Sequence, residues 1–577
     1  MSKINKKEIN GAQALIKCLE NHDVEYVFGY PGGAAIPIFD AIYDSKKLKL
    51  ILVRHEQGAT HMADGYARAT GKPGVVLVTS GPGATNTVTG LLTAQMDSIP
   101  MIILTGQQIT PSLGKDAFQE ADVFGITAPV VKHSYLVKNP NDIPRIVSES
   151  FHISNTGRPG PVLIDLPKDV SSGNCTASCT NITMDIPGFS GPKPPNKDDI
   201  QKLADTIKGS KRPLLLVGHG VIISKAHKVV LKLAEKLKSP VTSTLLGMGG
   251  FPENHDLSVG FLGMHGTAYA NKAVAECDLI FSIGSRWDDR ITPANLSRFC
   301  PNAKKCHIDI DPAEMNKIIT PDASCIGDAK EIVEQLLKLV TPLETTDWLE
   351  KVRKNKKKYP LSYKIHGGLK AQHVIDELYK LTNGDAIVTT DVGQHQMWTA
   401  QFYNFKRPNQ WITSGGAGTM GFGFPAAIGA QFGHPKETVI AVCGDGGFQM
   451  TLFELSTAVI NKLPIKIIII DNRYLGMVRQ WQELFFDDRL SGVDMIGNPD
   501  FVKVAEAYGC KAFRVKRPAD VKKVLTKALN YNEGPCLIHA EVVKQDNVFP
   551  MVPAGGTADE MIITPPTRKL AKPEGST

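Results

Sequence analysis

The sequence lacks the features that mark secreted, membrane-spanning and zinc-finger proteins. Its ten cysteines form no Cys-x-x-Cys pair, and the closest two, Cys175 and Cys179, lie in a segment rich in Ser, Thr and Asn. The first ten residues contain no apolar signal core, and apolar runs such as 467–470 are far shorter than the roughly 20 residues of a membrane helix. We therefore predict reduced thiols, a cytoplasmic location and no membrane contact.

The chain also has only a small excess of positive charge. The net charge is +7 over 577 residues, and much of the visible basic density is one Lys/Arg run at 351–358. Such a run is typical of a solvated linker or helix face, whereas nucleic-acid binding needs a basic stripe with aromatic or groove-fitting elements. We predict no nucleic-acid partner.

What the chain has is a repeated strand–glycine–helix pattern. Apolar runs at 75–79, 214–217, 279–283, 386–390 and 439–443 each precede a turn, as buried parallel strands do in α/β proteins. Pro/Gly-rich residues 186–195 and the polar, basic stretch 341–368 read as linkers. The predicted fold class is α/β with three doubly wound parallel-sheet domains, at 1–185, 196–340 and 368–577. The first and third domains share the strand–helix pattern and a similar size, which is compatible with a duplication.

Two strand ends in the third domain carry oxygen ligands. Gly444-Asp445-Gly446 follows an apolar strand, and Asn472 follows the next, 27 residues after Asp445. Such strand edges bind ligands in open α/β sheets, and magnesium prefers a few hard oxygen ligands plus phosphate oxygens. Asp445, the Asn472 amide oxygen and a backbone carbonyl near Tyr474 would supply them. The plainer alternative is a pair of polar turns with Asp and Asn as helix caps.

This pattern resembles the thiamine diphosphate enzymes, whose metal motif runs from Gly-Asp-Gly to a terminal Asn. That family usually reads Asn-Asn, whereas this chain has Asp471-Asn472 with the ligating second position intact. The resemblance implies thiamine diphosphate held through Mg²⁺, and it makes Glu56 the acid that activates the cofactor's aminopyrimidine. Without the resemblance, Glu56 reads as an exposed strand end. The family builds its site between subunits, with Glu56 of one facing Asp445 of the other, so a homodimer or higher oligomer is implied.

Contiguous segments narrow the resemblance to the large catalytic subunits of acetolactate synthase, also called acetohydroxyacid synthase. They lie at 28–33, 54–59, 79–86, 116–122, 157–161, 165–170, 393–398, 414–420 and 476–481. Such an enzyme decarboxylates pyruvate and adds the resulting hydroxyethyl carbanion to a second 2-ketoacid. The products, 2-acetolactate or 2-aceto-2-hydroxybutyrate, lead to valine, leucine and isoleucine. A separate small regulatory subunit is a further implied partner.

The resemblance also assigns site residues. Gly33 and Gln119 would line the reacting centre, Phe118 and Lys168 the substrate channel, and Trp481 and Arg290 would favour the larger ketoacid acceptor. Lys168 and Arg290 have a physical role of their own, since a ketoacid carboxylate pairs with a fixed cation. Trp481 could equally be a core residue. The implied thiamine diphosphate contacts, besides Glu56, are Val392, Gly393, Gln394, His395, Gly418, Met420, Gly446, Gly447, Gly476 and Met477.

The middle domain carries a weak nucleotide signal. Gly218 and Gly220 follow a strand, but the third glycine of the dinucleotide fingerprint is missing, so an ordinary turn is the plain reading. The resemblance implies a structural FAD, without a redox step, that contacts Arg158, Gly218, Gly220, Met264, His265, Gly284, Arg286, Asp309 and Asp328. Leu246 departs from relatives that carry Gln, which puts one flavin contact in doubt.

The alternatives are other thiamine diphosphate enzymes and a non-catalytic scaffold. Pyruvate and indolepyruvate decarboxylases carry an adjacent His-His pair that this chain lacks, and pyruvate oxidase is a further relative. Glyoxylate carboligase lacks the activating glutamate, whereas Glu56 is present. A non-catalytic flavoprotein scaffold would have lost Glu56, Asp445 or Asn472, and all three are retained.

Overall fold

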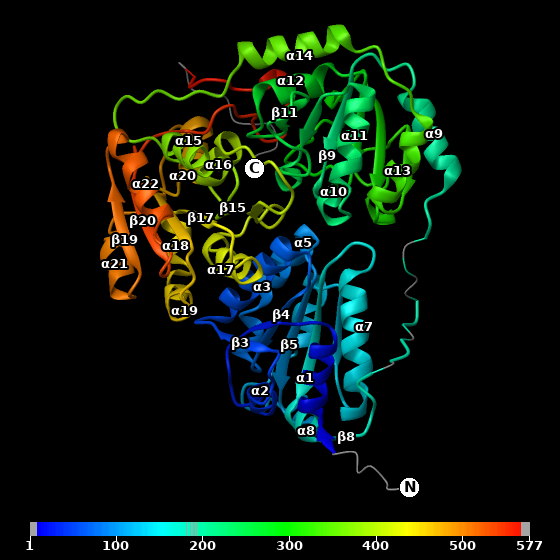
Figure 1. The fold of residues 1–577 in the computed structure, drawn as a ribbon, viewed down its shortest axis with the longest axis vertical. Coiled ribbons are helices and arrows are strands. Elements are labelled where there is room, and N and C mark those ends of the chain that lie inside the picture. Colours follow the sequence, from blue (N-terminus) through cyan, green and yellow to red (C-terminus); the bar gives the residue numbers. More distant parts are fainter. Residues whose placement is uncertain (1–7, 181, 185, 189–190, 192, 567–577) are drawn as a thin grey trace.

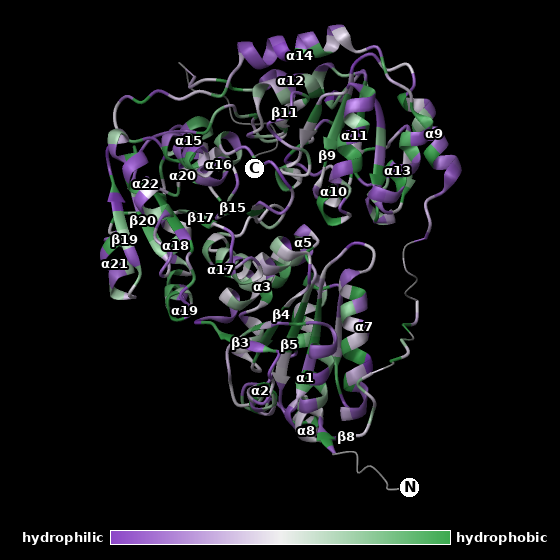
Figure 2. Ribbon diagram, in the orientation of Figure 1, coloured by the Kyte–Doolittle hydropathy of each residue, from purple (hydrophilic) through white to green (hydrophobic). Residues whose placement is uncertain are grey.

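Three six-stranded parallel sheets, each flanked by helices, form the molecule (Figure 1). The computed structural model describes residues 8–566 except 181, 185, 189, 190 and 192. The predicted fold class is confirmed. Some residues of the expected linker 186–195 lie outside the described part, and its described residues form no helix or strand. The strands in the interior are mostly hydrophobic, and the helices around them carry many hydrophilic residues (Figure 2).

The first sheet has the order β3-β2-β4-β5-β7-β6. Its strands are β2 (Tyr26–Gly29), β3 (Lys49–Leu52), β4 (Gly74–Val78), β5 (Met101–Gln107), β6 (His133–Leu136) and β7 (Pro161–Pro167). Alternate residues of β4 pack on opposite faces, Val75 and Leu77 against α1 (Gly11–Asn21), α2 (Ile36–Tyr43) and α7 (Ile143–Asn155). Val76 and Val78 pack against α3 (Glu56–Thr70) and α5 (Val88–Asp97). The sheet is therefore wound on both faces.

Short elements complete this domain. A two-stranded antiparallel sheet pairs β1 (Ile9–Asn10) with β8 (Asn174–Cys175). Short helices α4 (Pro82–Thr85), α6 (Val123–Thr127) and α8 (Lys168–Ser172) follow β4, β5 and β7 along the chain.

The middle sheet has the order β11-β10-β9-β12-β13-β14. Its strands are β9 (Pro213–Val217), β10 (Val241–Ser243), β11 (Ser258–Phe261), β12 (Leu279–Ile283), β13 (Lys304–Asp309) and β14 (Ala323–Ile326). Numbered within the sheet this is 3-2-1-4-5-6, the order of dinucleotide-binding folds, whose ligand crevice opens between the first and fourth strands. Its helices are α9 (Lys197–Ile207), α10 (His219–Ile223), α11 (His227–Leu237), α12 (Ala268–Glu276) and α13 (Ala329–Leu339).

The stretch 341–368 differs from the expected linker. It contains α14 (Thr346–Lys358), whose lysines face solvent while Trp348 and Val352 pack into the middle domain. The Trp348 indole N–H donates to the Pro213 carbonyl at 2.9 Å. The basic run is thus one face of an amphipathic helix, visible across the top of Figure 1, because two apolar residues at helical spacing find a core beneath it.

The third sheet has the order β16-β15-β17-β18-β20-β19. Its strands are β15 (Ile387–Thr390), β16 (Trp411–Thr413), β17 (Val439–Gly444), β18 (Lys466–Asp471), β19 (Lys511–Val515) and β20 (Cys536–Glu541). The helices α15 (Ala371–Thr382), α16 (Gln394–Phe402), α20 (Gly476–Phe485) and α22 (Val521–Leu529) pack on one face. The other face holds α17 (Gly423–Gly433), α18 (Asp445–Gln449), α19 (Leu455–Ile460) and α21 (Phe501–Ala507). Within each sheet, the first and third domains share the order 2-1-3-4-6-5.

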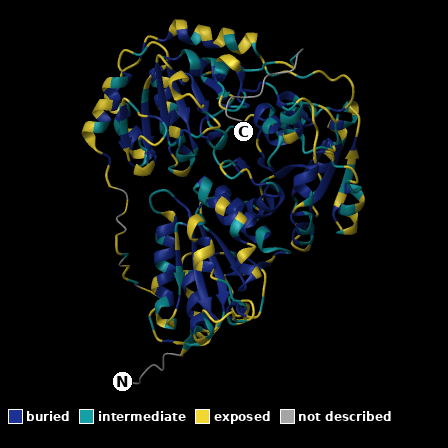
Figure 3. Cartoon of the chain, turned by 180° about the vertical axis from the view of Figure 1, so that it is seen from behind, coloured by how far each residue is buried: buried dark blue, intermediate teal, exposed yellow. Residues whose placement is uncertain are grey.

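Helices α3 and α17 join the first and third domains through a common apolar core. Each follows the second strand of its sheet, and each presents a glycine to the other. A Cβ on Gly65 would lie 2.1 Å from the Ala426 carbonyl oxygen, and one on Gly429 would lie 1.8 Å from that of Met62. Only glycine allows backbones to approach so closely. Figure 3 shows this contact region as buried.

All ten cysteines lie in the described part of the chain and are free thiols. No helix among the described residues is long and apolar enough to cross a bilayer.

Candidate active site

Buried acids gather at the carboxyl edge of the third sheet, where the strand order reverses. Neighbouring strands β15 and β17 run into Asp391 and Asp445, and β18 ends at Asp471 followed by Asn472; all four side chains are buried. A strand-order reversal opens a crevice at this edge. The structure therefore brings together the two predicted metal ligands, Asp445 and Asn472.

Hydrogen bonds link Asp445 to Asp471 through Asn498, whereas Asn472 bonds separately to Gln394 and Tyr474. Asn498 Nδ2 donates to Asp445 Oδ2 at 2.7 Å and more weakly to Asp471 Oδ1 at 3.4 Å. The Tyr474 N–H donates to Asn472 Oδ1 at 3.1 Å, so this residue also belongs to the cluster. Burial, and then the charge of Asp471, raises the pKa of Asp445, whereas contact with His539 helps to hold the pKa of Asp471 low. Two facing carboxylates at such an edge favour a bound cation.

Glycines let the backbone pack closely around these acids. A Cβ on Gly446 would lie 2.9 Å from Leu475 and 3.6 Å from Met420 Cε, and one on Gly447 would lie 2.6 Å from Asp391 Oδ2. A Cβ on Gly476, the first residue of α20, would lie 2.1 Å from Gln394 Oε1. This cradle with oxygen donors fits a magnesium-bound diphosphate. Among the described residues no group of three His, Cys, Asp or Glu side chains is placed to hold a metal ion.

The turn after β15 completes this edge. Gly393 has φ 146°, a conformation that favours glycine, and starts α16 at Gln394. Gln394 accepts from Asn472 Nδ2 at 3.1 Å and donates to Gln480 Oε1 at 3.0 Å. His395 is buried against Gly444, where a Cβ would lie 2.9 Å from its ring. Gly418 has φ 60° and lies beside Val392, with 4.0 Å between a Cβ placed on Gly418 and Val392 Cγ1.

The first-domain candidates occupy the corresponding edge of the first sheet. Gly33, Glu56 and Lys168 follow β2, β3 and β7, while Phe118 and Gln119 lie in the loop after β5. Glu56 is the first residue of α3 rather than a strand end, and its Oε2 accepts from Asn86 Nδ2 at 3.0 Å. In contrast to the third-domain acids, Glu56 is half-buried and the other four are exposed, Phe118 by 84%.

A cavity of about 850 Å³ lies where the three domains meet. Eight of the nine predicted flavin residues line it: Arg158, Gly220, Met264, His265, Gly284, Arg286, Asp309 and Asp328. Gly218 lies just beneath, because a Cβ there would be 2.0 Å from the Gly284 carbonyl oxygen. Leu246 is also on the wall, with its side chain 2.7 Å from a Cβ on Gly415. None of Gly33, Glu56, Phe118, Gln119, Lys168, Asp445 or Asn472 borders this cavity.

This cavity fits a dinucleotide. Gly220 and Gly284 lie at the crevice between β9 and β12. Asp309 ends β13 and Asp328 follows β14, where acids can bind ribose hydroxyls. Its volume is in the range of cofactor sites. Ser224 Oγ, on the wall, is buried without a hydrogen-bond partner among the described residues.

The cavity extends to the third-domain edge. Val392, Gly393, Gly418 and Met477 border it, as do Trp481 and Arg290. Trp481 is half-buried and packs on Phe485 with ring centres 5.4 Å apart, so it is both a wall and a packing residue. Arg290 is exposed and paired with Asp289.

Sequence reasoning missed several residues of these edges. Asn498 sits in a loop with no motif. Asp391 directly precedes Val392 at a strand end, a position that could have marked it as a site residue. Asp97 and Glu454 were also missed, since both act across the interface between domains and a single sequence does not show which segments meet.

Comparisons with known proteins agree with this geometry. Family models of thiamine pyrophosphate enzymes match in order: the N-terminal TPP binding domain at 9–126, the central domain at 200–336 and the C-terminal TPP binding domain at 391–540. The acetolactate synthase large subunit of Porphyra purpurea is 47% identical over 99% of this chain and 97% of its own length. The chain belongs to the acetolactate synthase large-subunit family of thiamine pyrophosphate enzymes.

Other members of the acetolactate synthase family agree over similar lengths. The acetolactate synthase of Mycobacterium bovis is 45% identical over 96% of this chain and 91% of its own length. The isozyme 3 large subunit of Escherichia coli is 44% identical over 96% and 98%. The family resemblance inferred from the motifs is therefore confirmed.

Proposed function

We propose that this protein is an acetolactate synthase. It decarboxylates pyruvate and joins the remaining two-carbon unit to pyruvate or 2-ketobutyrate, giving 2-acetolactate or 2-aceto-2-hydroxybutyrate for valine, leucine and isoleucine biosynthesis. The observation that carries this proposal is full-length likeness to acetolactate synthases together with an intact set of Glu56, Asp445 and Asn472.

The third-domain edge would hold thiamine diphosphate and Mg²⁺. Asp445, the Asn472 amide oxygen and the Tyr474 carbonyl supply hard oxygens to the ion, while Gly446, Gly447 and Gly476 keep the backbone open for the diphosphate. Val392 to His395, Gly418, Met420 and Met477 would surround the rest. When bound, the cofactor supplies a nucleophilic carbon and accepts the electrons released on decarboxylation.

Glu56 would hold a proton at the cofactor's aminopyrimidine nitrogen. Its side chain is half-buried on an edge of the first sheet where Phe118 is exposed. An open edge that carries a general acid is completed most simply by the third-domain edge of a second copy. The protein would then be at least a homodimer.

Cations and aromatic residues would position the substrates. Lys168 and Arg290 supply fixed charges for ketoacid carboxylates, and both side chains are exposed at their edges. Gly33 leaves open space, since a Cβ there meets nothing within 4 Å, and Gln119 would supply an amide from the loop after β5. Phe118 and Trp481 would exclude water and shape the acceptor pocket.

FAD would occupy the cavity between the three domains, whose wall includes Arg158, Arg286, Asp309 and Asp328. We assign the flavin a structural role, because the net reaction transfers no electrons to it. Free thiols throughout the chain agree with a cytoplasmic location. A separate small subunit that senses branched-chain amino acids is the expected regulatory partner.

One assay tests the function. Purified protein with Mg²⁺, thiamine diphosphate and FAD is given pyruvate, and the products are separated. Acetolactate as the main product supports the proposal, whereas acetaldehyde as the main product makes it a simple decarboxylase. The same assay with and without the candidate small subunit and valine tests the partner; unchanged activity and no valine response would remove it.

A further inference from the structure

Two carboxylates cross the interface between the first and third domains in opposite directions. Asp97, the last residue of α5, accepts from the N–H groups of Gly415 at 2.9 Å and Gly416 at 2.7 Å. Glu454, just before α19, accepts from those of Arg54 at 3.0 Å and His55 at 3.1 Å. Each lies between the third and fourth strands of its own sheet and binds successive amides that follow the second strand of the other.

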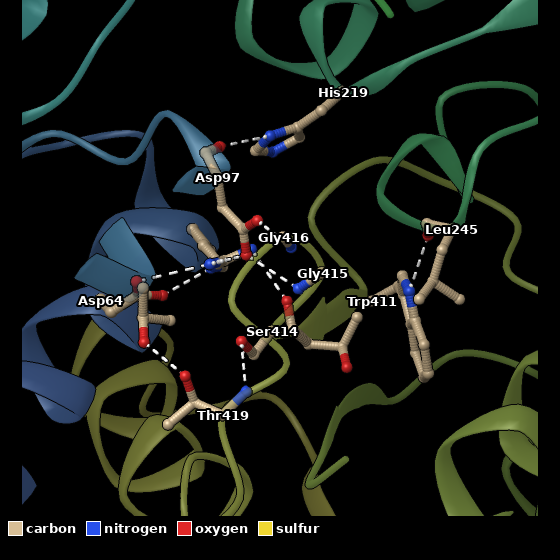
Figure 4. Close-up of polar contacts among 12 residues, drawn as sticks. Asp64, Asp97, His219, Leu245, Trp411, Ser414, Gly415, Gly416 and Thr419 are labelled. Carbon is tan, nitrogen blue, oxygen red and sulfur yellow. Dashed lines mark hydrogen bonds and ion pairs between the residues drawn. The ribbon is translucent and has the colours of Figure 1, made fainter. Parts of the chain in front are cut away.

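Asp97 is held firmly on its own side. Its carboxylate has no exposed area and accepts from Arg68 Nη2 at 2.8 Å, while Arg68 Nη1 donates to the Thr413 carbonyl at 3.0 Å (Figure 4). The Asp97 carbonyl also accepts from His219 Nδ1 of the middle domain at 3.0 Å. A single residue therefore joins all three domains.

The loop that Asp97 holds, residues 414–418, is shared by two sites. Its residues border the flavin cavity, and a Cβ on Gly416 would lie 3.2 Å from an Arg286 guanidinium nitrogen. At its far end Gly418 lies beside Val392 on the third-domain edge. Loosening this loop should therefore open the wall of the cavity.

Glu454 acts on the turn that leads into Glu56. It is fully buried, and Thr457 Oγ1 donates to its Oε2 at 2.6 Å. Its Oε1 would lie 2.2 Å from a Cβ on Gly58, so the carboxylate sits directly against the first turn of α3. The carboxylate fixes the point and the direction at which Glu56 leaves the sheet.

We propose that Asp97 and Glu454 are a reciprocal pair of positioning residues, Asp97 for the wall of the flavin cavity and Glu454 for the activating Glu56. Neither side chain reaches a reacting atom. The inference rests on the proposed function, because it assigns each carboxylate to one half of that site.

The test makes two measurements on the full-length protein and on each of the two variants. FAD affinity is measured by quenching of flavin fluorescence, and hydrogen–deuterium exchange at C2 of thiamine diphosphate is measured by NMR at saturating cofactor and Mg²⁺. Hydrogen bonds to charged groups support changes of about tenfold or more. Asp97→Asn should weaken FAD binding by about tenfold and leave exchange within about twofold. Glu454→Gln should slow exchange by about tenfold and leave FAD affinity within about twofold.

Matched controls separate positioning from stability. Asp64→Asn removes the other carboxylate on Arg68, and Thr457→Val removes the hydroxyl on Glu454; both leave the cross-domain amide bonds in place. These controls should lower the melting temperature without moving either measurement beyond about twofold.

Several results would contradict the proposed positioning roles of Asp97 and Glu454. If either variant moves both measurements in proportion to its loss of melting temperature, the carboxylates are merely structural. Wild-type values in Asp97→Asn or Glu454→Gln would also contradict them. Failure of the wild type to bind FAD, or wild-type exchange in Glu56→Gln, would instead reject the proposed sites themselves and the pair with them.

Discussion

The first and third domains share one strand order but treat their carboxyl edges differently. In the third, Asp391, Asp445 and Asn472 are buried and bonded to neighbours in the same chain. In the first, Lys168, Gln119 and Phe118 face solvent at the corresponding edge. One scaffold therefore carries a finished half-site and an open one. The difference teaches that topology places an edge, whereas the residues packed over that edge decide whether its side chains are buried.

The largest expected effects come from substitutions that inactivate the first-domain and third-domain half-sites separately. Glu56→Gln and Asp445→Asn should each lower acetolactate formation by roughly 10²- to 10⁴-fold, since one removes the proposed proton donor and the other a proposed metal ligand. If the halves meet between subunits, mixing the two inactive proteins after subunit exchange should restore about a quarter of wild-type activity, because half of the dimers then hold one intact site. The measurement is specific activity against mixing ratio. No recovery despite proven exchange would place both halves in one chain.

The sequence predicted the third-domain half better than the first. Gly444-Asp445-Gly446 and Asn472 end neighbouring strands, so local order alone brings them together. The same reasoning placed α/β units correctly because buried parallel strands are continuous apolar runs. For the basic run at 351–358 it left a solvated linker and a helix face open, and the structure shows the helix face, because Trp348 and Val352 pack on the middle domain. Contacts between domains, such as Glu454 with His55, had no signal in the sequence.

A second prediction tests whether the third-domain half is complete in itself. Asn498→Ala removes the amide that bridges Asp445 and Asp471, so the Mg²⁺ concentration for half-saturation should rise by about 10- to 100-fold. Thiamine diphosphate binding is measured by calorimetry across a magnesium series after removal of metal with a chelator. The matched change in the first domain, Asn86→Ala, removes the bond to Glu56 and should leave the magnesium requirement unchanged. A metal response in Asn86→Ala and none in Asn498→Ala would reverse the comparison.

A third prediction distinguishes the two aromatic side chains of the edges. Trp481→Ala should lower the preference for 2-ketobutyrate over pyruvate as acceptor by about tenfold, since it removes an apolar wall that contacts the extra methyl group. Phe118→Ala, on the open edge, should raise KM for both ketoacids alike. The product ratio at equal concentrations of both acceptors is the measurement. An unchanged ratio in Trp481→Ala would leave that residue a packing partner of Phe485.

The smallest expected effect concerns the pH dependence of the contact between the domains. Burial raises the pKa of Glu454 from 4.5 to about 7, against the hydrogen bonds of Thr457, Arg54 and His55 and the charge of Arg54. The native protein then keeps a proton that the unfolded chain releases, so the Glu454 contribution to stability is full below about pH 4.5 and is lost as the pH rises toward about 7.

Glu454→Gln carries no titrating proton at this position and should remove that slope. The difference in unfolding free energy between wild type and Glu454→Gln should therefore change by up to about 3 kcal/mol between pH 4.5 and pH 7.5, in favour of the variant at the higher pH. Urea unfolding of both proteins at several pH values measures it. Asp165, at the end of β7 in the first sheet, has its pKa raised to about 7 by burial and should add an independent slope that Glu454→Gln leaves in place. Parallel curves for wild type and Glu454→Gln would show that Glu454 is ionised throughout, held by its cross-domain amide bonds.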